Sequence, residues 1–307
     1  MDGNVSSTMT SHLIMAGTFS FCFMGVALIF LNALTILTFL VHRNLRKRSV
    51  FLPLSLCFAD MLVGVTSLKH GSGLTHFKNL TSLLKHFKSP NSMTTFDNFT
   101  ATASLAGLTI IAIERMHATV WPVRHRNLNN HPYFFAITLQ WAFAVALTII
   151  YTESIWVYFL IAMAAFAVGI LVISFSYILI FVTVKHQNAQ FQGHSTLAQQ
   201  RERELAKTLF IVTVLSLTTW APDMLWFFFQ RTAEKTESLL FVAALSLVFN
   251  LVRYFNSLIN PCIYMLRMKA FRRAFVKLLC RRNNNILPSE SRGPWRTTPP
   301  GNSHRFC

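Results

Sequence analysis

The 307-residue sequence is poor in charge, and in acidic residues above all. Asp and Glu together number 11, against 29 phenylalanines, and charged residues make up 13% of the chain, about half of the share that is typical of soluble domains. So little polar surface excludes a single soluble domain of this size. The numbers of Gly (11), Pro (10) and Cys (5) exclude collagen, low-complexity disorder and a disulfide scaffold. An integral membrane protein remains.

Long apolar runs support this interpretation. Three runs contain no charged residue, namely Leu13–Val41, Tyr133–Thr152 and Ile155–Val184. Four more contain one each: Ser49–Leu68, Ser89–Ile113, Thr208–Gln230 and Ser238–Leu266. Since about 20 apolar residues cross a bilayer as a helix, the sequence predicts an all-α membrane protein, a seven-transmembrane helix bundle.

The predicted spans divide the chain into four parts. Residues 1–12 form a short outer segment, and residues 13–266 form the bundle. Residues 267–282 are predicted to form an amphipathic helix in the membrane interface, because its apolar residues share one face and its basic residues the other. Residues 283–307 are rich in Pro, Ser and Arg, which predicts a disordered tail.

Lys and Arg are distributed unevenly between the two sides of the spans. Connections on the N-terminal side hold six, whereas those on the other side hold 21 with the tail. Because basic loops stay in the cytoplasm, we expect an extracellular N-terminus. The sequons at Asn4 and Asn79 fall on the outer side and are predicted glycosylation sites. The net charge of +17 therefore reflects topology, and seven spans exclude a nucleic-acid binder.

Polar residues at similar depth in three spans form a predicted cluster around Asp60. Ser104 lies in the third span, and Asn256, Ser257 and Asn260 lie in the seventh. Ionisable residues inside a membrane are costly and by default functional. Their oxygen atoms suit a small cation such as Na⁺. The alternative is a hydrated polar network that only joins the helices.

The pair Glu114-Arg115 ends the third span at the inner surface. The guanidinium of Arg115 can pair with Glu114, or with Glu202 ahead of the sixth span, since arginine suits bidentate pairing with carboxylates. In the alternative interpretation Arg115 only extends toward the interface.

Prolines within two spans predict kinks. Pro222 follows Trp220 in the sixth span, and Pro261 stands between Asn260 and Tyr264 in the seventh. Proline removes a backbone hydrogen bond and bends a helix. Two kinked helices beside a polar core offer hinges for a two-state rearrangement.

Taken together, these motifs resemble those of the rhodopsin-like (class A) G-protein-coupled receptors. The resemblance runs from Asn32 to Cys280 in the family's order. It rests on Leu56-x-x-x-Asp60, Glu114-Arg115-Met116, Trp141, Tyr177, Trp220-Ala221-Pro222, the intact Asn-Pro-x-x-Tyr motif of Asn260, Pro261 and Tyr264, and Phe271. The resemblance implies a sodium pocket at Asp60, Ser104, Trp220, Asn256 and Ser257, and an activation switch that includes Glu114, Arg115, Tyr177 and Glu202.

The sequence departs from the family pattern at the outer face. Pro90 stands at the position of the family's span-three cysteine, and the connection 153–154 has no cysteine, so we expect no outer disulfide. Gly169 stands where the fifth span usually has proline. These departures resemble the melanocortin-type branch, which neighbours the adenosine and cannabinoid receptors. Tyr254 occupies the place of an opsin's retinal-binding lysine, which disfavours an opsin.

For the ligand, the resemblance points to Asp97, Asp223, Trp220, Arg253 and Tyr254. In the family's amine receptors and many of its peptide receptors, an aspartate at the position of Asp97 binds an ammonium group of the ligand. Arg253 lies in the same outer region and carries the opposite charge. Two alternatives follow: Asp97 anchors a cationic ligand, or Asp97 pairs with Arg253.

The predicted function is that of a cell-surface receptor in the plasma membrane. An extracellular small molecule or peptide would shift the helices between two states and so activate a heterotrimeric G protein. The sequence shows no enzyme motif, and no cofactor is required, with Na⁺ as an allosteric ion. The alternative is a small transporter or channel, which predicts similar halves that the sequence lacks. Cys280, beside Arg281 and Arg282, is a predicted palmitoylation site that would add to contacts with membrane lipids.

Overall fold

The computed structural model describes residues 2–42, 45, 48–77, 81–82, 91–190, 218–222, 225–226, 239–267 and 269–283. Within these ranges all regular elements are helical, as the sequence predicts. They are α1 (Asp2–Val41), the short 3-10 turn η2 (Arg48–Val50), α2 (Phe51–Leu74), α4 (Ser92–Val120), α5 (Pro122–Arg126), α6 (His131–Glu153), α7 (Ile155–Gln190), α9 (Leu239–Arg267) and α10 (Lys269–Asn283).

Six helices in the described part of the chain are long and apolar enough to cross a membrane. They correspond to predicted spans one to five and seven. The sixth predicted span, Thr208–Gln230, lies mostly outside the described residues, and its described pieces 218–222 and 225–226 are helical.

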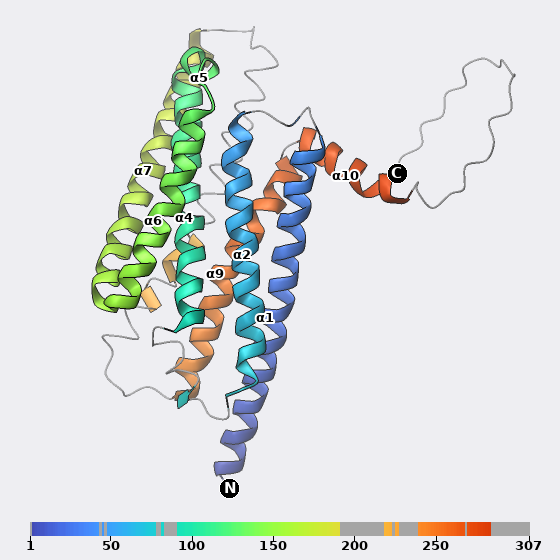
Figure 1. Ribbon diagram of the computed structural model, residues 1–307, viewed down its shortest axis with the longest axis vertical. Helices are drawn as coiled ribbons and strands as arrows, with labels where there is room; N and C mark the ends of the chain where they lie inside the picture. Colours follow the sequence, from blue (N-terminus) through green and yellow to red (C-terminus); the bar gives the residue numbers. More distant parts are fainter. Residues whose placement is uncertain are drawn as a thin grey trace, which may run out of the picture.

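The long helices run side by side as a bundle (Figure 1). Helix α1 packs along α2, α4 contacts α2, α6 and α7, and α9 packs against α1 and α2. Helix α10 leaves the bundle at a steep angle where α9 ends, as expected for an interfacial helix (Figure 1). We call the end with α5 and α10 the α10 end, and the opposite end, where the chain begins, the N-terminal end.

Polarity in the bundle is reversed relative to a soluble protein. Large apolar side chains on the outer surface are widely exposed, such as Phe19 (73%), Phe135 (70%) and Leu171 (68%). Asp60 and Asn260, by contrast, are fully buried. This arrangement suits a lipid environment, in which polar groups must be satisfied within the protein.

Helices α1 and α2 approach closely because glycines line their contact. A Cβ atom on Gly25 would lie 2.8 Å from the backbone oxygen of Gly64. A Cβ atom on Gly71 would lie 2.6 Å from the Cys22 Sγ atom. Small residues at such contacts let the helix backbones pack without hindrance.

Helix boundaries differ from the sequence prediction at several ends; for example, α4 continues past Ile113 to Val120 and α7 past Val184 to Gln190. Helix α2 continues to Leu74, so part of the expected outer connection 69–88 is helical. Helix α4 begins at Ser92 because the Asn91 side chain accepts hydrogen bonds from the backbone N–H groups of the next turn, as an N-cap does. Helix α1 already begins at Asp2, since no proline or glycine interrupts residues 4–16.

Candidate functional site

Asp60 lies at the centre of a buried polar cluster in the middle of the bundle. The Ser104 hydroxyl of α4 donates to Asp60 Oδ1 over 2.9 Å. The Asn260 amide of α9 donates to Oδ2 over 2.7 Å, and Ser257 is a further hydrogen-bond partner. Three helices thus meet at one carboxylate, and the structure brings together four of the five residues of the polar cluster predicted around Asp60 as a cation site.

The fifth residue, Asn256, is buried nearby on α9. Its side-chain oxygen and those of Asn32 and Asn260 are buried and have no hydrogen-bond partner among the described residues. Asn32 itself donates to the backbone oxygen of Ser257 over 3.4 Å. Oxygen atoms that have no hydrogen-bond donor suit a small, hard cation, which prefers oxygen ligands. The residues present therefore fit a sodium ion.

A second buried cluster lies nearer the N-terminal end and joins α4 to α9. Asp97 forms an ion pair with Arg253 and accepts a hydrogen bond of 2.9 Å from the Tyr254 hydroxyl. The Arg253 guanidinium also donates to Asn250 over 3.0 Å and lies over the Tyr254 ring. Asp97 and Arg253 are each 6% exposed, so the two opposite charges compensate each other out of water.

His70 of α2 extends this second cluster. Its Nδ1 atom lies 2.9 Å from the Tyr254 hydroxyl. Since that hydroxyl donates to Asp97, its oxygen is the acceptor for a proton on His70 Nδ1. Sequence analysis did not select His70, because it placed this residue in a loop beyond the second span.

Glu114 and Arg115 form a third cluster at the α10 end. Arg115 donates two hydrogen bonds to the Glu114 carboxylate, of 2.5 and 3.0 Å. His125 of α5 lies 3.3 Å from the same carboxylate, and Tyr133 of α6 lies 3.3 Å from His125. His117 packs against His125 with their Nδ1 atoms 3.2 Å apart. None of the three flanking side chains carried a motif in the sequence.

Gln140 of α6 is a further residue that sequence analysis missed. Its amide donates to the backbone oxygen of Ala103 over 2.9 Å and accepts from Ser55 over 3.0 Å. Trp141 donates to the same Ser55 hydroxyl over 3.1 Å. These bonds join α6 to α4 and α2. The signal in the sequence was that Gln140 is the single amide side chain in a span that has no charged residue.

The remaining predicted site residues occupy separate positions. Trp220 is buried against Phe166 and Ala101, Tyr177 packs in a cluster with Ile173, and Tyr264 packs with Phe271. Pro222 lies in the short described helix 218–222, and Pro261 lies within α9. Asn4 lies in α1 and Cys280 in α10. The predictions for Asp223, Glu202 and Asn79 lie outside the described residues.

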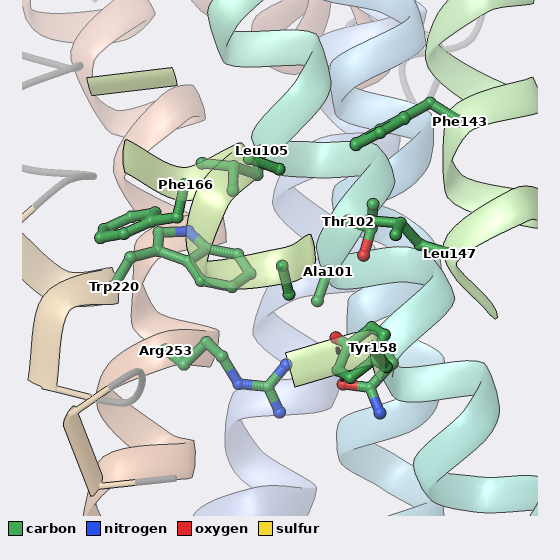
Figure 2. Close-up of a pocket in the computed structure, with 12 residues that line it drawn as sticks. Ala101, Thr102, Leu105, Phe143, Leu147, Tyr158, Phe166, Trp220 and Arg253 are labelled. Atoms are coloured by element: carbon green, nitrogen blue, oxygen red, sulfur yellow. Dashed lines mark hydrogen bonds between the residues drawn. The ribbon is translucent and has the colours of Figure 1, made fainter. Parts of the chain in front are cut away.

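A small cavity of about 40 Å³ lies between α4, α6, α7 and Trp220 (Figure 2). Apolar side chains form most of its wall, among them Leu105, Leu147 and Phe166. Arg253 lines the cavity on one side, whereas Asp97 does not. A ligand in this cavity would contact both Arg253 of the second cluster and Trp220.

Comparison with known proteins agrees with this architecture. The profile of the family described as "7 transmembrane receptor (rhodopsin family)" matches residues 31–158 and 150–264. Rhodopsin from Scyliorhinus canicula is 25% identical over 296 residues, covering 85% of this chain and 79% of the rhodopsin. Human melanocortin receptor 5 is 25% identical over 282 residues, covering 88% and 86%. Lysophosphatidic acid receptor 1 from Mus musculus is 26% identical over 305 residues, covering 90% and 78%.

The chain belongs to the rhodopsin family of seven-transmembrane receptors. It is therefore a multi-pass membrane protein and a G-protein-coupled receptor with the seven-helix fold, and its family is not enzymatic. Family membership disfavours the transporter or channel alternative. The relatives come from several branches at nearly equal identity, so the melanocortin-like branch stays a prediction.

Proposed function

We propose that the protein acts in the plasma membrane, with its N-terminus outside, as a ligand-operated switch for a heterotrimeric G protein. The basic character of the α10 end supports this orientation. Arg48, Arg115, Arg124 and Arg126 all lie there among the described residues, and such residues favour the cytoplasmic side.

The observation that carries the proposal is the pair of buried polar links between α4 and α9. The first link is direct, from Asp97 to Arg253 and Tyr254. The second passes through Asp60 of α2, which holds Ser104 and Asn260. A ligand that favours a different spacing of α4 and α9 would weaken or strengthen both links at once. Such a ligand drives the conformational change because its affinity differs between the two states.

The conformational change that the ligand causes would reach the G protein at the α10 end. Arg115 and Tyr264 lie in the last two turns of the same two helices, α4, which ends at Val120, and α9, which ends at Arg267. In this proposal Arg115 leaves Glu114 in the active state and contacts the G protein. Helix α10 would rest on the inner membrane surface beside that contact, because its sequence pairs an apolar face with basic residues.

Sodium, in this proposal, stabilises the resting state. Asp60, Ser104 and the orphaned amide oxygens of Asn256 and Asn260 would hold the ion. The ion supplies a positive charge that compensates Asp60 in the membrane interior. Movement of α9 away from α2 would disperse these ligands, so the ion and an agonist would oppose each other.

The experiment that tests the proposal measures G-protein activation in cells. The chain is expressed with an N-terminal epitope tag, together with dissociation reporters for each class of Gα subunit. We expect the tag to be labelled on intact cells, and at least one reporter to respond to basal or ligand-stimulated activity. Arg115→Ala should abolish that response at equal surface expression. A tag accessible only after permeabilisation would refute the orientation.

A response that survives Arg115→Ala unchanged would refute the role of the α10 end. The matched control is Arg126→Ala on α5, because its side chain has the same charge and lies at the same end but makes no contact with Glu114 in the structure.

A further inference from the structure

The cavity beside Trp220 is lined by donors from Trp220, Asn98 and Arg253, and by the hydroxyl groups of Thr102 and Tyr158, which can both donate and accept. The indole N–H of Trp220 is buried and has no hydrogen-bond partner among the described residues. Trp220 is 5% exposed, and its ring lies along the cavity wall beside Phe166 (Figure 2). A buried donor left unsatisfied is costly, so this position favours a ligand that supplies an acceptor.

The polar groups opposite Trp220 point to the same chemistry. Tyr158 of α7 donates its hydroxyl proton to Asn98 Oδ1 over 3.1 Å. This bond uses one of the two acceptor positions of Asn98 Oδ1, and the NH₂ group of Asn98, which lines the cavity, is a donor. Arg253 lies at the same side of the cavity (Figure 2) and can only donate.

Charge excludes most ionic ligands from this cavity. A cation would lie beside the guanidinium of Arg253, while the carboxylate that could attract it, Asp97, does not line the cavity. An anion would add a second negative charge to a buried site where Asp97 already compensates Arg253. Either ion would carry an uncompensated charge out of water, which is strongly unfavourable.

We propose that the cavity binds an uncharged, mostly apolar ligand through an oxygen acceptor, such as a carbonyl group, that takes the Trp220 indole proton. This inference rests on the proposed receptor function and specifies the ligand class for it. The connection between α6 and α7 consists of Ser154 alone, so this connection is too short to fold over the outer ends of these two helices.

The test uses four probes that share a five-membered ring: cyclopentanone, cyclopentylamine, cyclopentanecarboxylate and cyclopentane. The full chain is purified into lipid nanodiscs, and its thermal unfolding midpoint is measured against the concentration of each probe. A ligand that binds the folded state raises this midpoint with its concentration. We expect a saturable rise with cyclopentanone only. Equal rises with the amine or the carboxylate would overturn the proposal.

Two tryptophan variants identify the donor. Trp220→Phe keeps an aromatic ring but removes the N–H group, and we expect cyclopentanone to bind about tenfold more weakly, as for one hydrogen bond. Trp226→Phe is the matched control, because the Trp226 indole donates to Ser246 over 3.1 Å and does not line the cavity. Unchanged affinity in Trp220→Phe, or an equal loss in both variants, would overturn the role of Trp220.

A third variant keeps the test decisive if Trp220→Phe does not fold. Ala162 of α7 lines the cavity, so the larger side chain in Ala162→Leu should fill it while Trp220 stays unchanged, and we expect this variant to abolish cyclopentanone binding. Cyclopentanone binding that persists in Ala162→Leu would place the probe elsewhere and refute the site. Since these measurements use no G protein, their failure beside intact Arg115-dependent signalling would refute the ligand class and leave the proposed function standing.

Discussion

Asp97 and Arg253 have opposite charges and are buried against each other, which decides how each should respond to substitution. Removing one partner leaves the other charge uncompensated in a water-poor environment, and this costs more than the intact pair contributes. The same contact bears on the two sequence-based alternatives, because an aspartate already bound to arginine is a poor anchor for a ligand cation.

We therefore expect Asp97→Asn and Arg253→Gln each to destabilise the receptor by about 3–5 kcal/mol. The measurements are surface expression and the thermal unfolding midpoint. The double variant Asp97→Asn with Arg253→Gln, and the charge swap Asp97→Arg with Arg253→Asp, should both recover part of the loss. Asn250→Ala, which removes only a neutral partner of Arg253, is the milder control. Good expression of both single variants would contradict the buried pair.

Asp60 provides the test for sodium. If Asp60, Ser104 and Asn256 hold Na⁺ in the resting state, replacing Na⁺ by a large organic cation should raise basal signalling, and Asp60→Asn should remove this difference. The reason is linkage: an ion that favours one state must oppose whatever favours the other. Basal signalling is measured in membranes at constant ionic strength. A sodium response that Asp60→Asn leaves intact would reduce the cluster to a structural polar network.

At the scale of helices, the α1–α2 contact depends on residues without side chains. A Cβ atom on Gly25 would lie 2.7 Å from Leu68 and 2.8 Å from the backbone oxygen of Gly64. The backbone cannot yield as a flexible side chain can, so α1 and α2 would have to separate.

Gly25→Ala should consequently lower stability by about 1–3 kcal/mol, the range for overpacking, and lower the unfolding midpoint. Gly73→Ala on α2 is the matched control, because its nearest atom would be the Met93 methyl group at 3.6 Å. That substitution should be neutral or slightly stabilising, since alanine favours helix more than glycine does. Equal midpoints for the two variants would show that the helices adjust freely.

The sequence predicted the helices well and their ends less well. Long uncharged runs are enough to place spans, because the bilayer sets a minimum apolar length. The second apolar run was predicted to end at Leu68, just before Lys69, and so His70 was placed outside the second span. In the structure, Gly71 serves the close contact with Cys22, α2 continues, and His70 is buried beside Tyr254.

The same limit applies to the candidate site. Asp60, Ser104 and Asn260 were predictable as a cluster, because polar residues at equal depth in a membrane must find one another. Whether Asp97 pairs with Arg253 or with a ligand depends on the direction of its side chain, and the hydropathy pattern of a sequence carries no information on that direction. His125 was not predictable, since its contact with Glu114 depends on how α5 folds back against α4.

At the scale of the whole receptor, hydrogen bonds and an ion pair hold the N-terminal end in the described structure. The second cluster joins α2, α4 and α9, and the bond from Tyr158 to Asn98 joins α7 to α4. The described cysteines Cys22, Cys57 and Cys262 are free thiols. Of these links, the bond from Tyr158 to Asn98 joins α4 and α7, the helices that follow Pro90 and the connection 153–154, between which the family resemblance places an outer disulfide.

Mild reductant should therefore leave the receptor's thermal unfolding midpoint and agonist response unchanged. The comparison is a receptor of the same family that does carry an outer disulfide, which should lose stability under identical treatment, because a disulfide typically contributes about 2–4 kcal/mol. A drop in midpoint for this chain would mean that one of its cysteines, such as Cys22, pairs with another thiol in the membrane.

The third cluster lies where the receptor's output would arise. Arg115 is held by Glu114, and His125 contacts the same carboxylate from α5. If this arrangement is the resting state, loss of a partner should shift the two-state equilibrium toward the active form.

We expect Glu202→Ala, which removes the predicted second partner of Arg115, to raise ligand-free signalling severalfold. His125→Ala should raise it by a smaller factor, because the histidine acts on Glu114 and not on Arg115 directly. Basal G-protein activation at matched surface expression is the measurement, and His131→Ala, a substitution at an exposed residue at the start of α6, is the control. If basal signalling stays level in Glu202→Ala but rises in His125→Ala, then the contacts among α4, α5 and α6 alone stabilise the resting state.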